Sequence, residues 1–372
     1  MLDAGVLREG AICELGSALA VEAQGGTTVQ PWREPFRAAE AAGLAVTADA
    51  RELADASFDQ VVVHLQKSRA ASFDDLAEGW RLLRAGGALY LSGPNALGIV
   101  SAVKRLAAQL DHEGVILANR ARARIVRFVK DAGPGPERET TPMIDVRVER
   151  PGGEPLAFTL ATRPGVFSAK QLDAGSALLL EALPEMGERT TPGRIVDLGC
   201  GVGVLGLAAA LLWPGSQVLL VDADARAVAC ARENVARLEA SHPGLAARVR
   251  VEWWDARETP LDTGFDLALV NPPFHARGPE VDLGPALALF ASLDGWLAPK
   301  GRALVVANRT LPWEEPLSRV GQVEELRAAR GYKLLSLEPG SARRRSRSAS
   351  DKGRRAPGAR SAGRSRSPTR SR

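Results

Sequence analysis

Residues 194–206 read RIVDLGCGVGVLG, an apolar run that ends on an acid and then breaks into glycines. This pattern predicts a β-strand, a tight turn and a helix over 204–213. Gly199, Gly201 and Gly203 lack the side chains that would keep a ligand away from the main chain, and the helix start presents free N–H groups to that ligand. We interpret the turn, together with Asp197 before it, as a binding site for a nucleotide-like cofactor. The alternative is a tight turn that binds nothing.

Two later stretches indicate which cofactor this is. The strand predicted over 217–221 ends at Asp222, roughly 20 residues after the glycines, where an acid can accept hydrogen bonds from ribose hydroxyls. That position also suits a nicotinamide dinucleotide. Residues 265–274 read FDLALVNPPF, a strand that runs directly into Asn-Pro-Pro-Phe. A dehydrogenase has no use for this loop, so we favour S-adenosylmethionine.

The Asn-Pro-Pro-Phe loop has the chemistry to methylate a planar amine. The transfer requires two acceptors that hold both N–H bonds of the amine and draw its lone pair out of conjugation. The side-chain oxygen of Asn271 and the main-chain carbonyl of Pro272 are the predicted acceptors, and no general base is needed. Phe274 offers a face on which a base can stack. A rigid proline turn with no catalytic role is the alternative.

These motifs together are similar to those of the class I S-adenosylmethionine-dependent methyltransferases, and more narrowly to the ribosomal RNA guanine-N2 methyltransferases of the RsmC and RlmG type. Residues 163–176, RPGVFSAKQLDAGS, resemble the segment that precedes the cofactor loop in this family. The residues alone indicate a helix cap at 173–176. The resemblance implies in addition that the loop around Phe167 closes over the cofactor, that Asp197 reaches its methionine moiety, and that Asp255 accepts a hydrogen bond from its adenine.

The resemblance implies an enzyme that transfers a methyl group from S-adenosylmethionine to the exocyclic N2 amine of a guanine in ribosomal RNA, with 16S favoured over 23S. Its expected partner is ribosomal RNA or a ribosomal subunit. Two alternatives stay open. Protein glutamine and DNA adenine-N6 methyltransferases present a planar amine to the same kind of loop, and a non-catalytic RNA-binding assembly factor could retain the cofactor fold.

The composition is that of a globular protein. The chain has 372 residues, 45% of them hydrophobic and 25% charged, which is enough for two domains with separate cores. No apolar run reaches the ~20 residues of a membrane span, and the N-terminus lacks a basic and then apolar signal pattern, so we expect a cytoplasmic protein without a membrane partner. Three cysteines and four histidines show no ligand spacing, and we expect neither disulfides nor a metal.

The positive charge is concentrated at the C-terminal end. The formal charge of the chain is +4, whereas residues 341–372 carry 11 Arg and 1 Lys against 1 Asp, a net of +11, so the remaining residues carry −7. This Ser-Arg-rich tail has no large apolar residue to bury, and we predict that it is disordered. Its two interpretations are an arm that binds RNA phosphates and an incidental extension.

A unit of strand, helix and strand occurs twice in the same order. Residues 58–65, FDQVVVHL, a helix through Trp80 and residues 86–91 correspond to residues 265–270, a helix through Trp296 and residues 301–306. The first copy has neither Asn-Pro-Pro-Phe nor a cofactor-type glycine turn. We therefore predict a duplicated α/β protein with a degenerate methyltransferase-like domain at 1–130, a linker at 131–142, a catalytic domain at 143–340 and the tail at 341–372. The segment before Ala11 is short compared with the usual start of the family that the chain resembles, so we expect the first sheet to be incomplete.

The predicted catalytic domain alternates strands and helices, which indicates a parallel sheet with helices on both faces, a Rossmann-like fold. A hairpin over 143–161 leads into it, and 332–337 is expected to close the sheet as its last strand. The other strands are expected near Ile195, Val218, Val249, Leu267 and Ala303. The candidate ligand residues follow these strands, at the edge where open sheets bind ligands.

Overall fold

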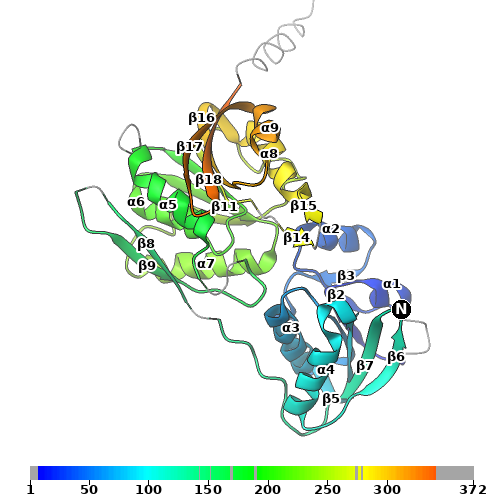
Figure 1. Ribbon diagram of the computed structural model, residues 1–372. Coiled ribbons are helices and arrows are strands. Elements are labelled where there is room, and N and C mark those ends of the chain that lie inside the picture. Colours follow the sequence, from blue (N-terminus) through cyan, green and yellow to red (C-terminus); the bar gives the residue numbers. More distant parts are fainter. Residues whose placement is uncertain are drawn as a thin grey trace, which may run out of the picture.

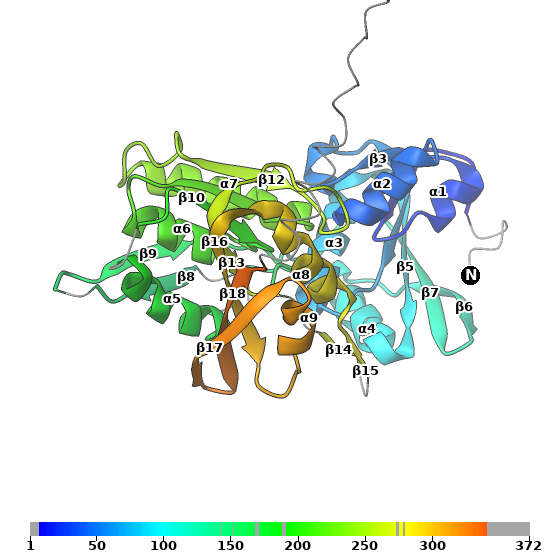
Figure 2. The ribbon, with the colours of Figure 1, turned by 90° about the horizontal axis from the view of Figure 1, so that it is seen from above.

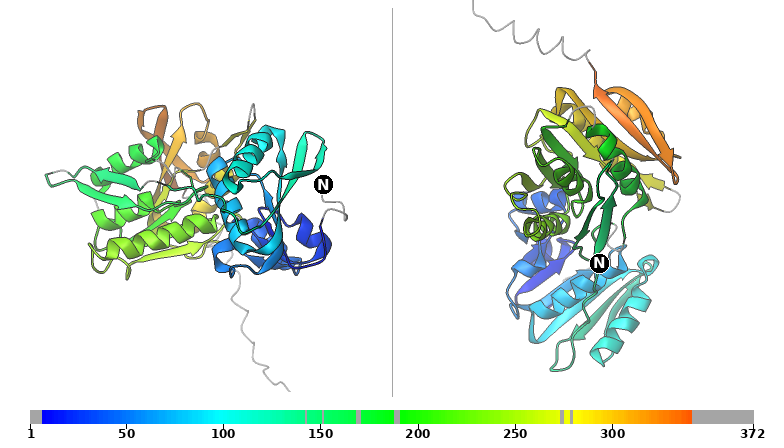
Figure 3. Two further views of the ribbon diagram at one scale, coloured as in Figure 1. Left: turned by 90° about the horizontal axis from the view of Figure 1, so that it is seen from below. Right: turned by 90° about the vertical axis from the view of Figure 1, so that its left-hand side faces the viewer.

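The computed structural model describes residues 7–141, 143–150, 152–167, 171–187, 191–272, 275–277 and 280–340. Within these ranges, two α/β units lie side by side, each around its own seven-stranded sheet (Figure 1, Figure 2, Figure 3). The predicted tail at 341–372 and the predicted stacking residue Phe274 lie outside the described residues.

The N-terminal unit consists of β1 to β7 and their helices. Its sheet has the order β3-β2-β1-β4-β5-β7-β6, in which β1 to β5 are parallel and β6 and β7 are antiparallel to their neighbours. The elements are β1 Ile12–Leu15, α1 Leu19–Gln24, β2 Thr27–Val29, α2 Arg33–Ala41, β3 Ala45–Thr47, β4 Phe58–His64, α3 Arg69–Leu82, β5 Leu83–Pro94, α4 Ile99–Leu110, β6 Val115–Arg120 and β7 Ala123–Val129, with short 3₁₀ turns at Ala50–Glu52 and Asn95–Leu97.

The C-terminal unit consists of β8 to β18. A hairpin of β8 and β9 precedes a sheet of order β12-β11-β10-β13-β16-β18-β17, and β14 and β15 form a second small hairpin. The elements are β8 Ile144–Val148, β9 Leu156–Leu160, α5 Ala174–Gly187, β10 Arg194–Leu198, α6 Val204–Leu212, β11 Gln217–Asp222, α7 Ala225–Glu239, β12 Val249–Trp253, β13 Phe265–Val270, β14 His275–Arg277, β15 Glu280–Asp282, α8 Gly284–Trp296, β16 Leu297–Asn308, α9 Glu314–Ser318, β17 Gly321–Ala329 and β18 Tyr332–Pro339.

The two sheets correspond strand for strand, so the predicted duplication is confirmed. The expectation of an incomplete first sheet is wrong. Its central strand begins at Ile12 and pairs on both sides, with β2 and with β4. A duplicate of this fold therefore needs no strand before Ile12. The predicted linker at 131–142 falls between β7 and β8, and its limits stay a prediction.

The far edge of the second sheet differs from the prediction. The strand expected at 332–337 forms as β18, but it lies between β16 and β17, and β17 is the edge strand. Residues 321–329 read GQVEELRAA and are half-buried or exposed throughout. An edge strand that pairs on one side and faces water carries charged residues, and its sequence then lacks the apolar run by which strands are recognised.

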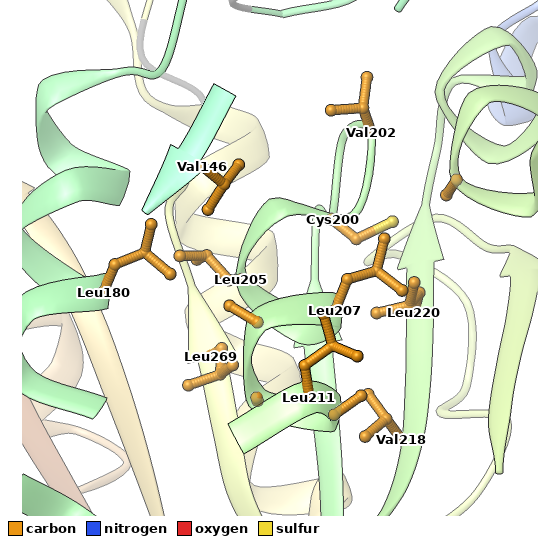
Figure 4. Close-up of a cluster of buried hydrophobic side chains, with 14 of the residues drawn as sticks. Val146, Leu180, Cys200, Val202, Leu205, Leu207, Leu211, Val218, Leu220 and Leu269 are labelled. Carbon is orange, nitrogen blue, oxygen red and sulfur yellow. The ribbon is translucent and has the colours of Figure 1, made fainter. Parts of the chain in front are cut away.

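Helix α6 packs tightly against the second sheet. It follows the glycine turn and is apolar on all sides. It is buried along most of its length because the sheet covers one face, and α5 with the hairpin of β8 and β9 covers the other. A Cβ atom at Gly206 would lie 2.1 Å from Cδ2 of Leu220, so only glycine permits this approach. Figure 4 shows the side chains that form this packing: Leu205, Leu207 and Leu211 of α6, Val218 and Leu220 of β11, Val146 of β8 and Leu180 of α5.

Candidate active site

A cavity of about 290 Å³ lies at the carboxyl ends of β10 to β13 in the C-terminal unit. This is the edge where open parallel sheets bind ligands. Seven of the residues predicted from the sequence line this one cavity, although they come from distant parts of the chain: Phe167, Asp197, Gly199, Gly201, Asp222, Asp255 and Asn271.

The glycine turn leaves room for a ligand against the main chain. Gly199 and Gly201 have φ values of +74° and +56°, which side chains disfavour. A Cβ atom on Gly201 would meet nothing within 4 Å, and one on Gly199 would meet only Cδ1 of Leu289, at 3.8 Å. Side chains at these two positions would therefore enter open space beside the cavity, so the turn fits a nucleotide-like cofactor.

Gly203 has a different environment from the other two glycines. It does not belong to the residues that line the cavity; it is the N-cap of α6, with φ +93°. A Cβ atom there would lie 2.9 Å from Cδ1 of Leu207. The positive φ and the close approach to Leu207 account for a glycine at this position. Contact between Gly203 and the cofactor stays a prediction.

The carboxyl groups of the buried Asp197 and the half-buried Asp222 hold the turn in place. Oδ2 of Asp197 accepts a hydrogen bond from the Gly206 amide at 2.8 Å, and Oδ2 of Asp222 accepts one from the Gly201 amide at 2.8 Å. Burial raises the pKa of Asp197 to about 7 and that of Asp222 to about 6, because both lose the water that stabilises a carboxylate. Each carboxylate oxygen has a second lone pair for a ligand donor.

The loop after β12 forms another part of the lining. Asp255 is 9% exposed, and its Oδ1 accepts a hydrogen bond from the Arg257 amide at 2.9 Å. Trp254 is buried and lines the cavity, with its indole N–H donated to the carbonyl of Thr259 at 3.0 Å. The ring of Trp253 does not line the cavity and packs against Phe36 of the N-terminal unit.

Asn271 lies at the end of β13, and its side-chain nitrogen is anchored. Nδ2 donates to Oδ2 of Asp173 at 2.8 Å and to Oγ of Ser176 at 2.9 Å. Because a carboxylate only accepts hydrogen bonds, the nitrogen must face Asp173, and the amide oxygen is left for another donor. Pro272 is buried beside it.

The roles of Asp173 and Ser176 toward Asn271 were missed from the sequence. Their predicted role as a helix cap is confirmed, since Oδ2 of Asp173 also accepts from the Ser176 amide at 2.9 Å, at the start of α5. A capping pattern looks the same whether or not the capping carboxylate has a second partner. Only the fold, which brings α5 beside the end of β13, reveals the second contact.

The N-terminal unit lacks the counterparts of Asp222 and Asn271. Leu15 of β1 pairs with Val29 and Val63 as Leu198 of β10 pairs with Val221 and Val270, so the next residues, Gln30 and His64, take the positions of Asp222 and Asn271. Nε2 of His64 lies 2.7 Å from Oε1 of the buried Glu14. In the N-terminal unit, His64 thus makes this contact from the position that corresponds to Asn271, which lines the cavity of the C-terminal unit.

Comparisons with known proteins agree with this site. The Methyltransferase small domain family matches residues 157–336. The ribosomal RNA small subunit methyltransferase C of Pseudoalteromonas atlantica is 32% identical over 266 residues, which cover 71% of this chain and 72% of the relative. The chain belongs to the ribosomal RNA small subunit methyltransferase C family. Members of this family use S-adenosylmethionine, so the predicted family and cofactor are confirmed.

Two further proteins place the chain within the methyltransferases. The ribosomal RNA large subunit methyltransferase G of Shewanella pealeana is 36% identical over 157 residues, but these cover only 42% of this chain and 37% of the relative. The solved structure of the Thermus thermophilus 16S rRNA N2 G1207 methyltransferase, RsmC, in complex with AdoMet and guanosine superposes with a TM-score of 0.76 at 28% identity, over 90% of each chain. The likeness to methyltransferase C extends over both units.

In the described part of the chain, no group of three or more His, Cys, Asp or Glu side chains could hold a metal ion. No helix among the described residues is long and apolar enough to cross a bilayer.

Proposed function

We propose that this chain transfers a methyl group from S-adenosylmethionine to the N2 amine of a guanine in the ribosomal RNA of the small subunit. The observation that supports this reaction most directly is the anchored side chain of Asn271, whose oxygen is left to accept a hydrogen bond from an amine. The relatives are ribosomal RNA small subunit methyltransferases, which supports ribosomal RNA as the substrate. We place the reaction in the cytoplasm, where ribosomes are assembled.

The cofactor residues divide by position in the cavity. Gly199 and Gly201 open the main chain to the cofactor, and Asp222 at the end of β11 holds its ribose hydroxyls. Asp255 accepts from the adenine amine, Asp197 lies beneath the turn, and the half-exposed Phe167 covers the opening. When bound, S-adenosylmethionine supplies an electrophilic methyl group on a sulfonium sulfur.

Asn271 prepares the guanine amine for attack. In free guanine the N2 lone pair is conjugated with the ring and is a poor nucleophile. Hydrogen bonds from the two N–H groups to the Asn271 Oδ1 atom and the Pro272 carbonyl orient the amine so that its lone pair points out of the ring plane. The new bond forms between nitrogen and the methyl carbon as the carbon–sulfur bond breaks. The amine then loses one proton to water, so the site needs no basic side chain.

The base must leave its stack to reach this site. A paired guanine is extruded at an energetic cost of a few kcal/mol, and contacts with the RNA offset this cost. Phe274, three residues after Asn271 in the sequence, is the proposed stacking surface for the extruded base.

The test is methyl transfer by the purified full chain. Radiolabelled S-adenosylmethionine is offered with small subunits, large subunits and deproteinised ribosomal RNA, and the labelled nucleosides are separated by chromatography. We expect label in N2-methylguanosine from small-subunit RNA, and an initial rate lower by roughly 10²–10³ with Asn271→Ala. Label only in large-subunit RNA, in a protein glutamine or in DNA adenine would contradict the proposal, as would transfer at the wild-type rate in the variant.

A further inference from the structure

We propose that the N-terminal unit, which lacks cofactor residues of its own, forms one wall of the cofactor cavity in the C-terminal unit, and that Trp32 contacts the adenosine of S-adenosylmethionine there. The inference depends on the cofactor and not on which base is methylated.

A short two-stranded contact joins the units beside the cavity. The Arg33 amide donates to the Ala223 carbonyl at 2.9 Å, and the Ala225 amide donates to the Pro31 carbonyl at 2.8 Å. The pair places Trp32 opposite Asp224, two residues after the proposed ribose acid Asp222. The main chain of the N-terminal unit therefore holds the loop that follows β11.

Trp32 lines the cavity together with residues of the C-terminal unit. It is 45% exposed, although its main chain is part of the contact between the units. An indole is a large apolar surface, and aromatic side chains beside nucleotides commonly stack on the base. The Arg226 guanidinium carbon lies 5.9 Å from the Trp32 ring centroid and helps to hold the indole.

The loop after β12 is held by the same segment of the N-terminal unit. Arg33 donates through Nε and Nη2 to both carboxylate oxygens of Glu258, at 2.7 and 3.1 Å. Glu34 forms an ion pair with Arg257, which lines the cavity two residues after Asp255. The start of α2 thus contacts both loops that carry the proposed adenosine acids.

An aromatic contact completes this docking. Phe36 packs edge-on against Trp253, with ring centroids 4.8 Å apart, and the Arg33 guanidinium lies 5.1 Å from the Trp253 centroid. A loop held in its binding conformation loses less entropy when the ligand binds. The N-terminal unit therefore contributes to cofactor affinity in two ways, through the surface of Trp32 and through the fixed loops.

The position of Trp32 in the duplicated fold explains why this segment is available. Gln30 of the N-terminal unit takes the position of Asp222, at the end of the strand where a functional copy binds ribose. The loop that would serve a cofactor in its own unit instead reaches across to the cofactor cavity of the other.

The experiment is calorimetric titration of the full chain with S-adenosylmethionine in the absence of RNA. We compare Trp32→Ala and Trp32→Phe with the wild type, and we use Leu19→Ala as the matched control, since Leu19 is an apolar side chain of the same unit that is 63% exposed. Loss of one stacked aromatic ring raises the dissociation constant about tenfold in Trp32→Ala. Trp32→Phe keeps a ring and should lose less, and Leu19→Ala should bind as the wild type does.

A second measurement guards against a folding defect. The thermal midpoints without ligand should agree among the variants, while the increase in midpoint on adding S-adenosylmethionine should be smaller for Trp32→Ala. Wild-type affinity in Trp32→Ala would overturn the proposal. Failure of the guanine assignment would instead show in the identity of the labelled nucleoside and would leave these affinities unchanged.

Discussion

Asn271 can activate an amine only if the oxygen of its side chain, and not the nitrogen, faces the substrate. The two ends of an amide have nearly the same shape, so packing alone does not choose between them. Asp173 makes the choice, because its carboxylate accepts hydrogen bonds and repels the amide oxygen. The proposed catalytic oxygen is therefore directed by the carboxylate of Asp173, which lines the same cavity.

The first residue-scale prediction concerns Asn271. Replacement with alanine removes one of two acceptors that act only as the amine is reorganised, so kcat should fall by roughly 10²–10³. The dissociation constant for S-adenosylmethionine, measured by calorimetry, should change little. Asn119→Ala, at an exposed position of β6, is the control and should leave both quantities unchanged. A loss confined to cofactor affinity would show that Asn271 binds the cofactor instead.

Ser176 provides a second prediction. Ser176→Ala removes one acceptor of the Asn271 nitrogen but leaves the Asp173 cap of α5, so kcat should fall several-fold, by about 1 kcal/mol of transition-state stabilisation. Combining it with Asn271→Ala distinguishes positioning from a general effect. If Ser176 acts through Asn271, its replacement has no further effect in the double variant. An equal loss in both backgrounds would assign Ser176 a separate role.

At the scale of the element, α6 is held against the sheet by close approach at Gly206. An alanine there would bring Cβ within 2.1 Å of Leu220 Cδ2, so the buried Leu220 side chain, the helix or the strand must shift. Gly206→Ala should lower the free energy of unfolding by about 1–3 kcal/mol, measured with urea. Gly215→Ala is the matched control, because a Cβ atom at that exposed turn meets nothing within 4 Å. Equal stability of the two variants would contradict this packing.

Asp197 accepts a hydrogen bond from the Gly206 amide in the first turn of α6. Its raised pKa leads us to predict that the stability of the chain depends on pH. The pKa of Asp197 is raised from 3.8 to about 7 in the folded chain, so between these values the folded state binds more protons than the unfolded state. The contribution of Asp197 to stability is therefore lost as pH rises from about 4 to 7. Asp197→Asn cannot titrate, so the stability difference between wild type and variant should move in favour of the variant across this interval. Denaturation at a series of pH values, without cofactor, measures it; parallel curves would contradict the burial of this carboxyl group.

The elements show what the sequence alone predicts well. The strands at 194–198 and 265–270 were predicted, because buried parallel strands are continuous apolar runs that end in recognisable turns. Strand β17 has no such run, and its place at the edge follows from pairing with β18. The residues of the site likewise fall into those that the sequence predicts and those that only the fold reveals. Asp222 and Asn271 belong to local motifs, whereas the contacts of Ser176 and Trp32 arise between segments far apart in the chain.

At the scale of the molecule, the charge is distributed unevenly between residues 1–340 and residues 341–372. Residues 1–340 carry a net −7 and should be repelled by RNA at long range, while residues 341–372 carry +11. Removing the tail should weaken RNA binding and flatten its dependence on salt, because fewer counterions are released. Filter binding between about 50 and 200 mM salt measures this slope. Exchange of the tail arginines for lysine should preserve the slope, whereas an unchanged slope after truncation would assign RNA binding to the folded units.

The measurement that tests the central claim most directly is nucleoside mass spectrometry of ribosomal RNA, separated by subunit, from cells that lack this chain. The cells are complemented with the wild type or with Asn271→Ala. We predict that the amount of N2-methylguanosine in small-subunit RNA falls and that the wild type restores it, whereas Asn271→Ala does not restore it to the wild-type level. Unchanged N2-methylguanosine in both subunits would contradict the proposed function.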